Sequence, residues 1–184
     1  MIISFVFPTV KHKPGLKKKL IEILRKNLDN GDFFEWDDRE GTGRGNGSFC
    51  GSAGSLSMAI FQGYFGIDFG KDFLILEPKL GTDPARVHVY IPAVDLYVAY
   101  EYGYTPEEEK ISMEYKSNFP GQGKIKVLIP EEMKAGSEKA SEALRVFLDG
   151  REVPYEHFIL HRDEFIVVET DFRRHKLKIS RNRY

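Results

Sequence analysis

Glu35 is the residue of this sequence in which a reactive group meets the most unusual surroundings. It lies between Phe34 and Trp36 in the stretch DFFEWDDREGTGRGNGSFCGSAG, residues 32–54, which is rich in acids, aromatics and glycines. Aromatic side chains next to a carboxylate can exclude water from it or stack on the face of a sugar. The pattern raises the hypothesis of an acid or base that acts on a carbohydrate. The alternative is that Glu35 is one of several acids in an ordinary surface loop.

Two neighbours in this stretch are candidate ligand-binding residues. Trp36 is the only tryptophan of the chain, and it either packs in a core, its usual role, or forms a platform for a sugar. Arg44 stands between two glycines and could pair with a carboxylate or a phosphate. The glycines of GTGRGNGS do not have the spacing of a phosphate-binding loop, and no Lys-Ser or Lys-Thr pair follows them. A nucleotide site is therefore not predicted.

No metal or cofactor is predicted. Cys50 is the only cysteine, which excludes a disulfide within the chain and a site with several cysteines. His157 and His161 are four residues apart, but in a strand context, where we do not expect a zinc site. No serine stands in a G-x-S-x-G motif.

Charge and hydropathy exclude several partners. The 27 basic and 28 acidic residues give a net charge of -1, so no overall field favours nucleic acid or an anionic membrane. No apolar stretch approaches the roughly 20 residues of a transmembrane helix. In MIISFVFPTVKHK the basic residues follow the apolar run, which is the wrong order for a secretory signal. We expect a cytoplasmic protein that contacts neither nucleic acid nor membrane, and we expect this apolar run to be buried.

Helices are predicted in the first part of the chain and strands in the remainder. In LKKKLIEILRKNLDN, residues 16–30, leucines and isoleucines recur on one helical face. A second helix is expected in SAGSLSMAIFQGYFG, residues 52–66, with Ser52 as a possible cap and Gly66 at its end. From residue 72 onward, short alternating runs are separated by turn signals, among them Asp149-Gly150 and a turn near Arg162-Asp163.

These elements predict an α+β chain in which a short helical segment precedes an antiparallel β-sandwich. The expected division is a helical segment over residues 1–71 and a sandwich domain over residues 72–184. Two helices cannot close a core alone, so we expect the helical segment to pack on another surface.

Four passages, in this order, resemble the C-terminal end of the six-hairpin glycosidases, enzymes with an (α/α)6 toroid and a β-sandwich. LIEILRKNLDNGDFFEWDD is similar to the last outer helix and the aromatic and acidic active-site loop. GRGNGSFCGSAGSLSMAI is similar to the return into the final inner helix, and GYFGIDFGKDFLILEPKL to the passage that leaves the toroid. The fourth passage, KIKVLIPE with LRVFLDGREVP and HKLKIS, resembles the closing sandwich.

The resemblance and the residue types together indicate roles for residues of the candidate loop. The resemblance implies Glu35 as the general base. With the residue types, we expect inverting hydrolysis of an O-glycosidic bond, Phe34 and Trp36 lining a sugar subsite and Arg44 as a substrate-binding residue. Attack by inorganic phosphate near Arg44 and Ser48 is a less favoured variant. The implied ligand is an oligosaccharide or another glycoside.

The second carboxylate that this chemistry needs, about 6.5–9.5 Å from the first, is not found. Residues 1–31 offer only Glu22 and Asp29, both in the amphipathic helix, and Asp37 and Asp38 are too close to Glu35 in sequence. A complete toroid has six helical hairpins, whereas this chain supplies two helices. We therefore expect a C-terminal part of an enzyme that is inactive alone and is completed by the missing helical portion or by another chain.

Two other functions stay open. Tyr90, Tyr97, Tyr100, Tyr102 and Tyr104 cluster on the long strand pair, and an exposed row of aromatics can hold a glycan or meet a helical domain. The first alternative is a non-catalytic carbohydrate-binding module. The second is a structural domain that caps a larger helical partner, and the interface role is the one we favour for the tyrosines.

Overall fold

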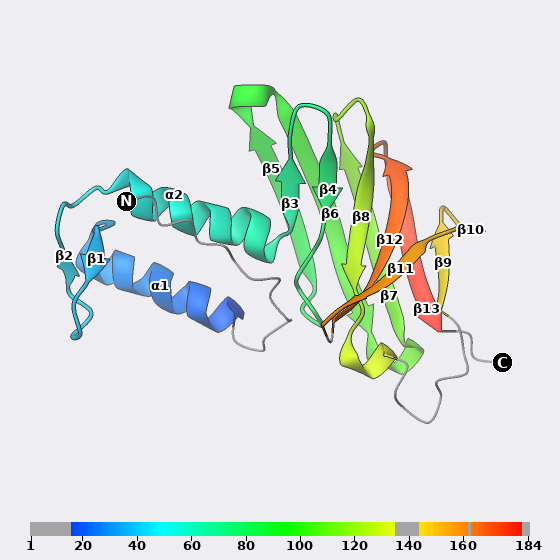
Figure 1. Ribbon diagram of the computed structural model, residues 1–184, viewed down its shortest axis with the longest axis horizontal. Helices are drawn as coiled ribbons and strands as arrows, with labels where there is room; N and C mark the ends of the chain where they lie inside the picture. The colour runs from blue at the N-terminus through cyan, green and yellow to red at the C-terminus, as the bar shows by residue number, and fades with distance from the viewer. Residues whose placement is uncertain (1–15, 135–143, 162, 182–184) are drawn as a thin grey trace. The chain divides into compact units, whose positions relative to one another are not determined.

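The structure is a computed structural model, and it describes residues 16–134, 144–161 and 163–181 (Figure 1). The chain forms two compact units, Met1–Tyr64 and Phe65–Tyr184, whereas the sequence predicts two domains that meet after residue 71. The apolar run that opens the chain lies outside the described residues. No described helix has the length and apolar character needed to cross a membrane.

The first unit contains two helices and a short hairpin. Helix α1 spans Leu16–Asn30, as predicted, and α2 spans Cys50–Met58 and continues as the π-helical segment η1, Ala59–Tyr64. The α2 helix starts before the predicted Ser52 cap: Phe49 is the N-cap, and Ser52 Oγ donates to the Phe34 carbonyl over 2.7 Å. The described residues of this unit thus supply two helices and no complete toroid.

The apolar stripe of α1 is only partly covered. Leu20 is buried against Leu56 and Ala59 in a small cluster. Further along the same stripe, however, Leu24 is 37% exposed and Leu28 is 77% exposed. The two helices therefore share a core of few residues and retain an uncovered apolar surface.

The second unit consists of strands and short 3-10 turns. The strands are β3 (Ile67–Phe69), β4 (Leu74–Leu76), β5 (Ala85–Ile91), β6 (Leu96–Thr105), β7 (Lys110–Ser117), β8 (Gln122–Leu128), β9 (Leu144–Leu148), β10 (Arg151–Glu152), β11 (Glu156–Leu160), β12 (Asp163–Asp171) and β13 (His175–Arg181). The 3-10 turns are η2 (Pro92–Val94), η3 (Pro106–Glu108) and η4 (Glu131–Met133).

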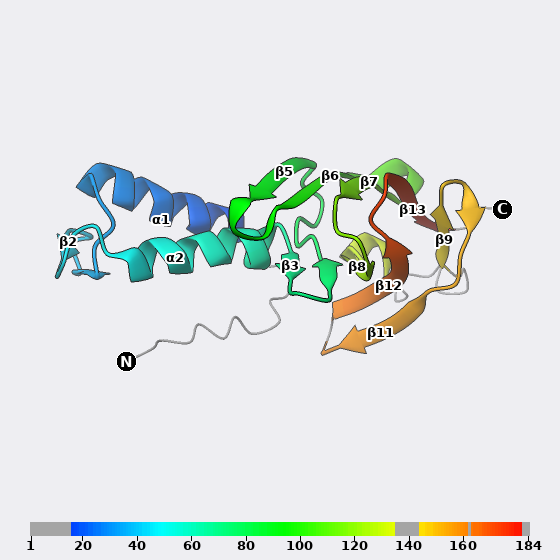
Figure 2. The same cartoon turned by 90° about the horizontal axis from the view of Figure 1, so that it is seen from above.

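These strands form two sheets that lie as layers within the unit (Figure 2). One is six-stranded, in the order β10-β9-β13-β7-β6-β5, and the other is five-stranded, in the order β11-β12-β8-β4-β3. All pairs are antiparallel except β4 with β8. Between the layers, the Tyr115 hydroxyl on β7 lies 2.8 Å from Thr170 Oγ1 on β12. The predicted α+β fold with a β-sandwich is confirmed.

Two tight turns confirm predicted hairpins. Asp149 and Gly150 join β9 to β10 with φ of 50° and 79°, the left-handed pair that a two-residue type I′ turn requires. The β11–β12 hairpin turns at residues 161–162, since Leu160 pairs with Asp163. Arg162 itself lies outside the described residues.

The prediction of an exposed tyrosine row is wrong for Tyr100 and Tyr102. Tyr100 and Tyr102 are 1% and 4% exposed, and their hydroxyls donate to the carbonyls of Phe65 and Gly81 over 2.7 and 2.8 Å. Both residues lie on the face of β6 that meets the second sheet, where a buried phenol is stable because its hydroxyl is bonded. Tyr90, at 58% exposure, is on the opposite face. Tyr100 and Tyr102 therefore serve neither as a glycan platform nor as an interface.

Candidate functional site

The candidate loop is organised around a two-strand hairpin (Figure 1). Its strands are β1, Trp36–Asp37, and β2, Gly43–Arg44, and Trp36 pairs with Arg44. Asp38 closes the turn, since its Oδ1 accepts the backbone N–H groups of Glu40 and Thr42 over 3.1 and 2.9 Å. Because the amides of the turn are bonded within it, this segment has a defined shape despite its glycines.

Asp32 fixes the other end of the loop. Its carboxylate accepts the backbone N–H of Ser48 over 2.6 Å and the Ser48 hydroxyl over 2.8 Å. The hydrogen bond from the Ser48 hydroxyl, followed by that from the Phe33 backbone, lowers the pKa of Asp32. Asp32 is therefore an ionised structural acceptor that ties the start of the loop to the start of α2.

Two glycines allow the loop to close on its own aromatic residues. A Cβ on Gly43 would lie 2.1 Å from the Phe34 ring. Gly45 has φ of +77°, and a Cβ there would lie 2.8 Å from the side chain of Glu35 and 3.2 Å from Trp36 Nε1. Only glycine fits such close approaches. Glu35 and Trp36 thus both lie against the backbone of Gly45.

The four predicted site residues have different surroundings. Phe34 is half-buried in the loop, whereas Glu35 is exposed and Trp36 is 56% exposed. Within the described part of the chain, the Glu35 carboxylate forms no hydrogen bond or ion pair. Arg44 Nε donates to Asp38 Oδ2 over 2.8 Å, so this guanidinium is engaged inside the loop. The structure brings Glu35 and Trp36 together as the accessible pair.

The acids nearest to Glu35 in sequence are occupied or fully solvated. Asp32 and Asp38 accept hydrogen bonds from the loop, and Asp37 is exposed on β1. Glu22 is on α1, 3.9 Å from Lys18 Nζ. None of these carboxylates is both buried and free to serve as a general acid opposite Glu35.

Comparisons with known proteins show a likeness in structure. No family model matches the sequence, and no characterised protein matches it in sequence. An alpha-L-rhamnosidase from Dictyoglumus thermophilum superposes with a TM-score of 0.53 at 15% identity, over 84% of this chain. The chain is similar in structure to part of large glycoside hydrolases. At this identity the likeness shows the fold alone, and the chain spans 17% of the length of the rhamnosidase.

Two other structures give weaker superpositions. A GH127 beta-L-arabinofuranosidase from Geobacillus Stearothermophilus T6 has a TM-score of 0.41 at 13% identity, over 72% of this chain and 19% of that one. A cycloalternan-forming enzyme from Listeria monocytogenes, solved with a pentasaccharide substrate, has a TM-score of 0.42 at 9% identity, over 60% of this chain and 11% of that one. Neither score is high enough to support an argument.

The sequence reasoning missed a second group of polar side chains, on the outer face of the six-stranded sheet. Glu101 on β6 stands directly opposite Glu114 on β7, and His88, Lys116 and Arg174 line the same cavity. The signal in the sequence is alternation, because every second residue of S-M-E-Y-K is polar. Which of these residues face one another across the strands depends on the strand register, which cannot be read from the sequence.

A histidine and two aspartates form a third cluster, at the start of β13. His175 Nδ1 lies 2.6 Å from Asp149 Oδ2, and its Nε2 lies 2.8 Å from Asp171 Oδ1. Partial burial opposes the charge of the imidazole, but the hydrogen bonds and charges of the two aspartates outweigh burial and raise the pKa of His175. The hydrogen bond from His175 is in turn the largest cause that lowers the pKa of each aspartate.

This cluster predicts a pH-dependent stability. His175 has a folded pKa above its ordinary 6.5, so its contribution is full below that value and is lost as pH rises through the raised pKa. The aspartates, with pKa values below 3.8, contribute above 3.8 and lose their effect as pH falls. We expect His175→Gln to lower the free energy of unfolding by about 1–2 kcal/mol near pH 5.5 and by less near pH 8.5.

Urea denaturation of the wild type and the variant at both pH values measures this difference. His157→Gln is the matched control, because His157 pairs with Glu164 over 2.9 Å but is 45% exposed. An equal loss for His175→Gln at the two pH values would contradict the role of the charged imidazole.

Proposed function

We propose that this chain is the C-terminal part of an inverting glycoside hydrolase, in which Glu35 is the general base and Trp36 a platform for the sugar. The observation that supports this most is the setting of Glu35. Its carboxylate is exposed and uncommitted, and it lies with Trp36 against Gly45 on a loop in which Asp32 and Asp38 accept hydrogen bonds. The fold likeness to a rhamnosidase supports the same class of reaction.

In the proposed reaction, Glu35 takes a proton from a water molecule while the oxygen of that water attacks the anomeric carbon. The glycosidic C–O bond breaks as a second carboxylic acid gives its proton to the departing oxygen. Trp36 offers an indole face to the C–H surface of the sugar. The second acid comes from helices outside this chain, because the described acids near Glu35 do not supply it.

The uncovered surface of the helical unit supports completion by further helices. Ile23 and Leu28 on α1 and Met58 on α2 are 45%, 77% and 58% exposed. Phe61, on η1, is 36% exposed. Large apolar surfaces of this kind usually mark a contact with another protein surface. The same observation favours a second candidate, a structural domain that caps a larger helical partner without taking part in catalysis.

Fluorescence of Trp36 distinguishes the two candidates. Because Trp36 is the sole tryptophan, every change in tryptophan emission reports the candidate subsite. We expect neutral mono- and disaccharides, L-rhamnose among them, to shift the emission to shorter wavelength with a Kd of about 1–10 mM, since only half of the site is present. Glu35→Gln should weaken this binding about tenfold, as it removes a charged acceptor.

Glu40→Gln is the control, because Glu40 is an exposed acid of the same turn and should leave the titration unchanged. The proposal fails if no sugar changes the emission of the folded protein. It also fails if Glu35→Gln binds as tightly as the wild type. Either result leaves the capping role as the better account.

A further inference from the structure

The outer face of the six-stranded sheet carries a row of four charged side chains. Register places Arg86 opposite Glu101, Glu101 opposite Glu114, and Glu114 opposite Lys176. The row therefore crosses β5, β6, β7 and β13 with a cation at each end and two carboxylates in the centre. Like charges directly opposite each other on neighbouring strands are destabilising, so the central pair calls for an explanation.

Flanking cations hold the two carboxylates in place. Arg86 Nε lies 2.8 Å from Glu101 Oε1. On the other side, Arg174 Nε donates to Glu114 over 2.7 Å, and Lys176 Nζ lies 3.4 Å from the same carboxylate. The hydrogen bond from Arg174 is the largest cause that lowers the pKa of Glu114. Glu114 is therefore ionised at neutral pH and fixed in position.

Small residues on either side of this row leave room for a ligand. Ala99 lies between His88 and Lys116 in one neighbouring row, and Gly103 lies opposite Ser112 in the other. A cavity of about 200 Å³ is present on the first side and one of about 300 Å³ on the second. Glu101 and Glu114 line both, so the charged row borders a depression on each side, and we call the two depressions together the outer groove.

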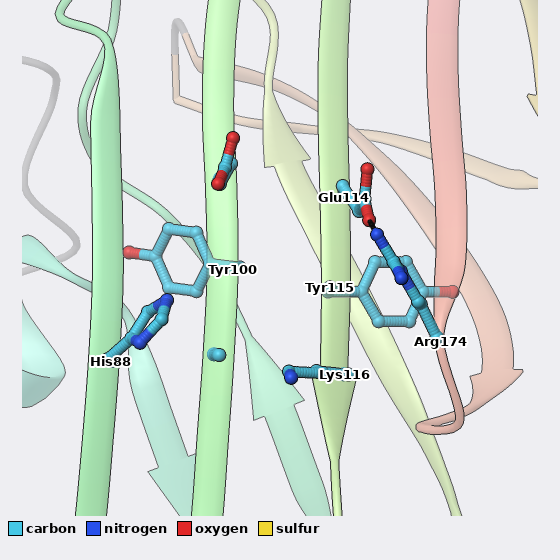
Figure 3. A pocket seen from close by; sticks show the side chains of 8 residues that line it. His88, Tyr100, Glu114, Tyr115, Lys116 and Arg174 are labelled. Carbon is cyan, nitrogen blue, oxygen red and sulfur yellow. Dashed lines mark hydrogen bonds and ion pairs between the residues drawn. The ribbon is translucent and has the colours of Figure 1, made fainter.

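Figure 3 shows the first half of the outer groove, with His88, Lys116 and Arg174 around it and Arg174 joined to Glu114. Tyr97 contacts two of the residues that line this half. Tyr97 meets His88 edge-on at 6.4 Å between ring centroids, and Lys116 Nζ is 5.4 Å from the Tyr97 centroid. The outer groove thus offers fixed acceptors and fixed donors within a few residues.

We propose that the outer groove binds a neutral oligosaccharide, at a site separate from the Glu35 loop. Sugar hydroxyls donate to the central carboxylates, and sugar oxygens accept from Lys116 and Arg174. The second cavity, at about 300 Å³, is at the lower end of the ~300–1,000 Å³ typical of ligand clefts.

The mixed charge of the outer groove disfavours an apolar helix, which would desolvate at least four charged groups. A neutral polyol satisfies donors and acceptors of both signs without adding charge. The inference goes beyond the proposed hydrolase function, because it assigns binding to the sandwich and needs no part of the helical unit.

Amide chemical-shift mapping tests the proposal with xylotetraose, cellotetraose and maltotetraose as neutral probes and polygalacturonate as the anionic comparator. We expect a neutral probe to shift amides on β5, β6 and β7 with a Kd of about 0.1–10 mM. Glu101→Gln should weaken binding about tenfold, since a charged acceptor is lost. Gly103→Val should abolish binding by filling the second cavity. A Cβ on Gly103 meets only Ser112 Oγ at 3.5 Å, and the amide spectrum of the variant shows whether the fold is retained.

Controls locate the binding. Glu169→Gln alters an exposed pair with Lys124, 3.1 Å apart, on the other sheet and should leave binding unchanged, as should Trp36→Ala. The proposal is overturned if no neutral probe binds, if polygalacturonate binds more tightly, or if both groove variants bind like the wild type. Loss of binding in Trp36→Ala would overturn it while supporting the hydrolase site. Binding in the outer groove without a change in Trp36 fluorescence would support the groove and count against the sugar site at Glu35.

Discussion

Gly66→Ala is expected to destabilise the sandwich unit by about 3 kcal/mol, a large fraction of the stability of a typical domain. Gly66 has φ of +65°, and a Cβ on it would lie 1.7 Å from the carbonyl oxygen of Glu77. Backbone atoms at this distance cannot move aside without breaking the adjacent bond from Glu77 N to Gly66 O, which is 2.7 Å long. That bond flanks the β3–β4 pair, in which Ile67 is opposite Leu76.

Gly150→Ala is the control, because it measures the cost of a left-handed backbone conformation without a steric clash. Gly150 also has a left-handed φ, +79°, but a Cβ on it would have no other atom within 4 Å, so the substitution should cost only about 1–2 kcal/mol. Urea denaturation of the two variants, compared with the wild type, gives both values. Equal losses would show that the approach of Gly66 to Glu77 is not the cause.

Local patterns were sufficient to predict several elements. The helix over residues 16–30 begins and ends as predicted because its apolar spacing is regular and Asn30-Gly31 stops it, with Gly31 at φ of +74°. The Asp149-Gly150 turn needs only two residues that accept a left-handed backbone. Each of these features depends only on residues within one helix or turn, so it can be predicted from the local sequence.

Burial could not be predicted in the same way. The alternation of β6 shows that Tyr100 and Tyr102 share a face, but it does not show which face another sheet covers. The partners of their hydroxyls, Phe65 and Gly81, lie far away in sequence. The exposure of Leu28 likewise depends on what packs against the helix, which its own amphipathic pattern does not specify.

In the candidate site, too, some features could be predicted from local sequence and others could not. Residue types and the resemblance single out Glu35 and Trp36, whereas the engagement of Arg44 by Asp38 follows from closure of the turn. Arg44 is consequently a weaker substrate-binding candidate than the sequence suggests. The outer groove depends on the register of four strands, and no single segment of the sequence contains it.

Glu35→Gln is expected to reduce kcat of the complete enzyme by about 10²–10⁴, the usual contribution of a general base. An amide has nearly the same shape as the carboxylate but cannot take a proton from the attacking water. The Glu35 side chain forms no bond with the described residues, so the fold should be unaffected. Glu40→Gln, in the same turn, should retain full activity.

Hydrolysis of aryl glycosides, measured with this chain alone and with the longer or multichain enzyme that contains it, tests the central claim most directly. The prediction is that the chain alone releases no aryl alcohol, whereas the complete enzyme does so with inversion at the anomeric carbon and loses this activity in Glu35→Gln. Turnover by the 184-residue chain alone that Glu35→Gln abolishes would contradict the claim that the second carboxylate lies elsewhere. Full activity of the Glu35→Gln complete enzyme would contradict the role of Glu35 as the base.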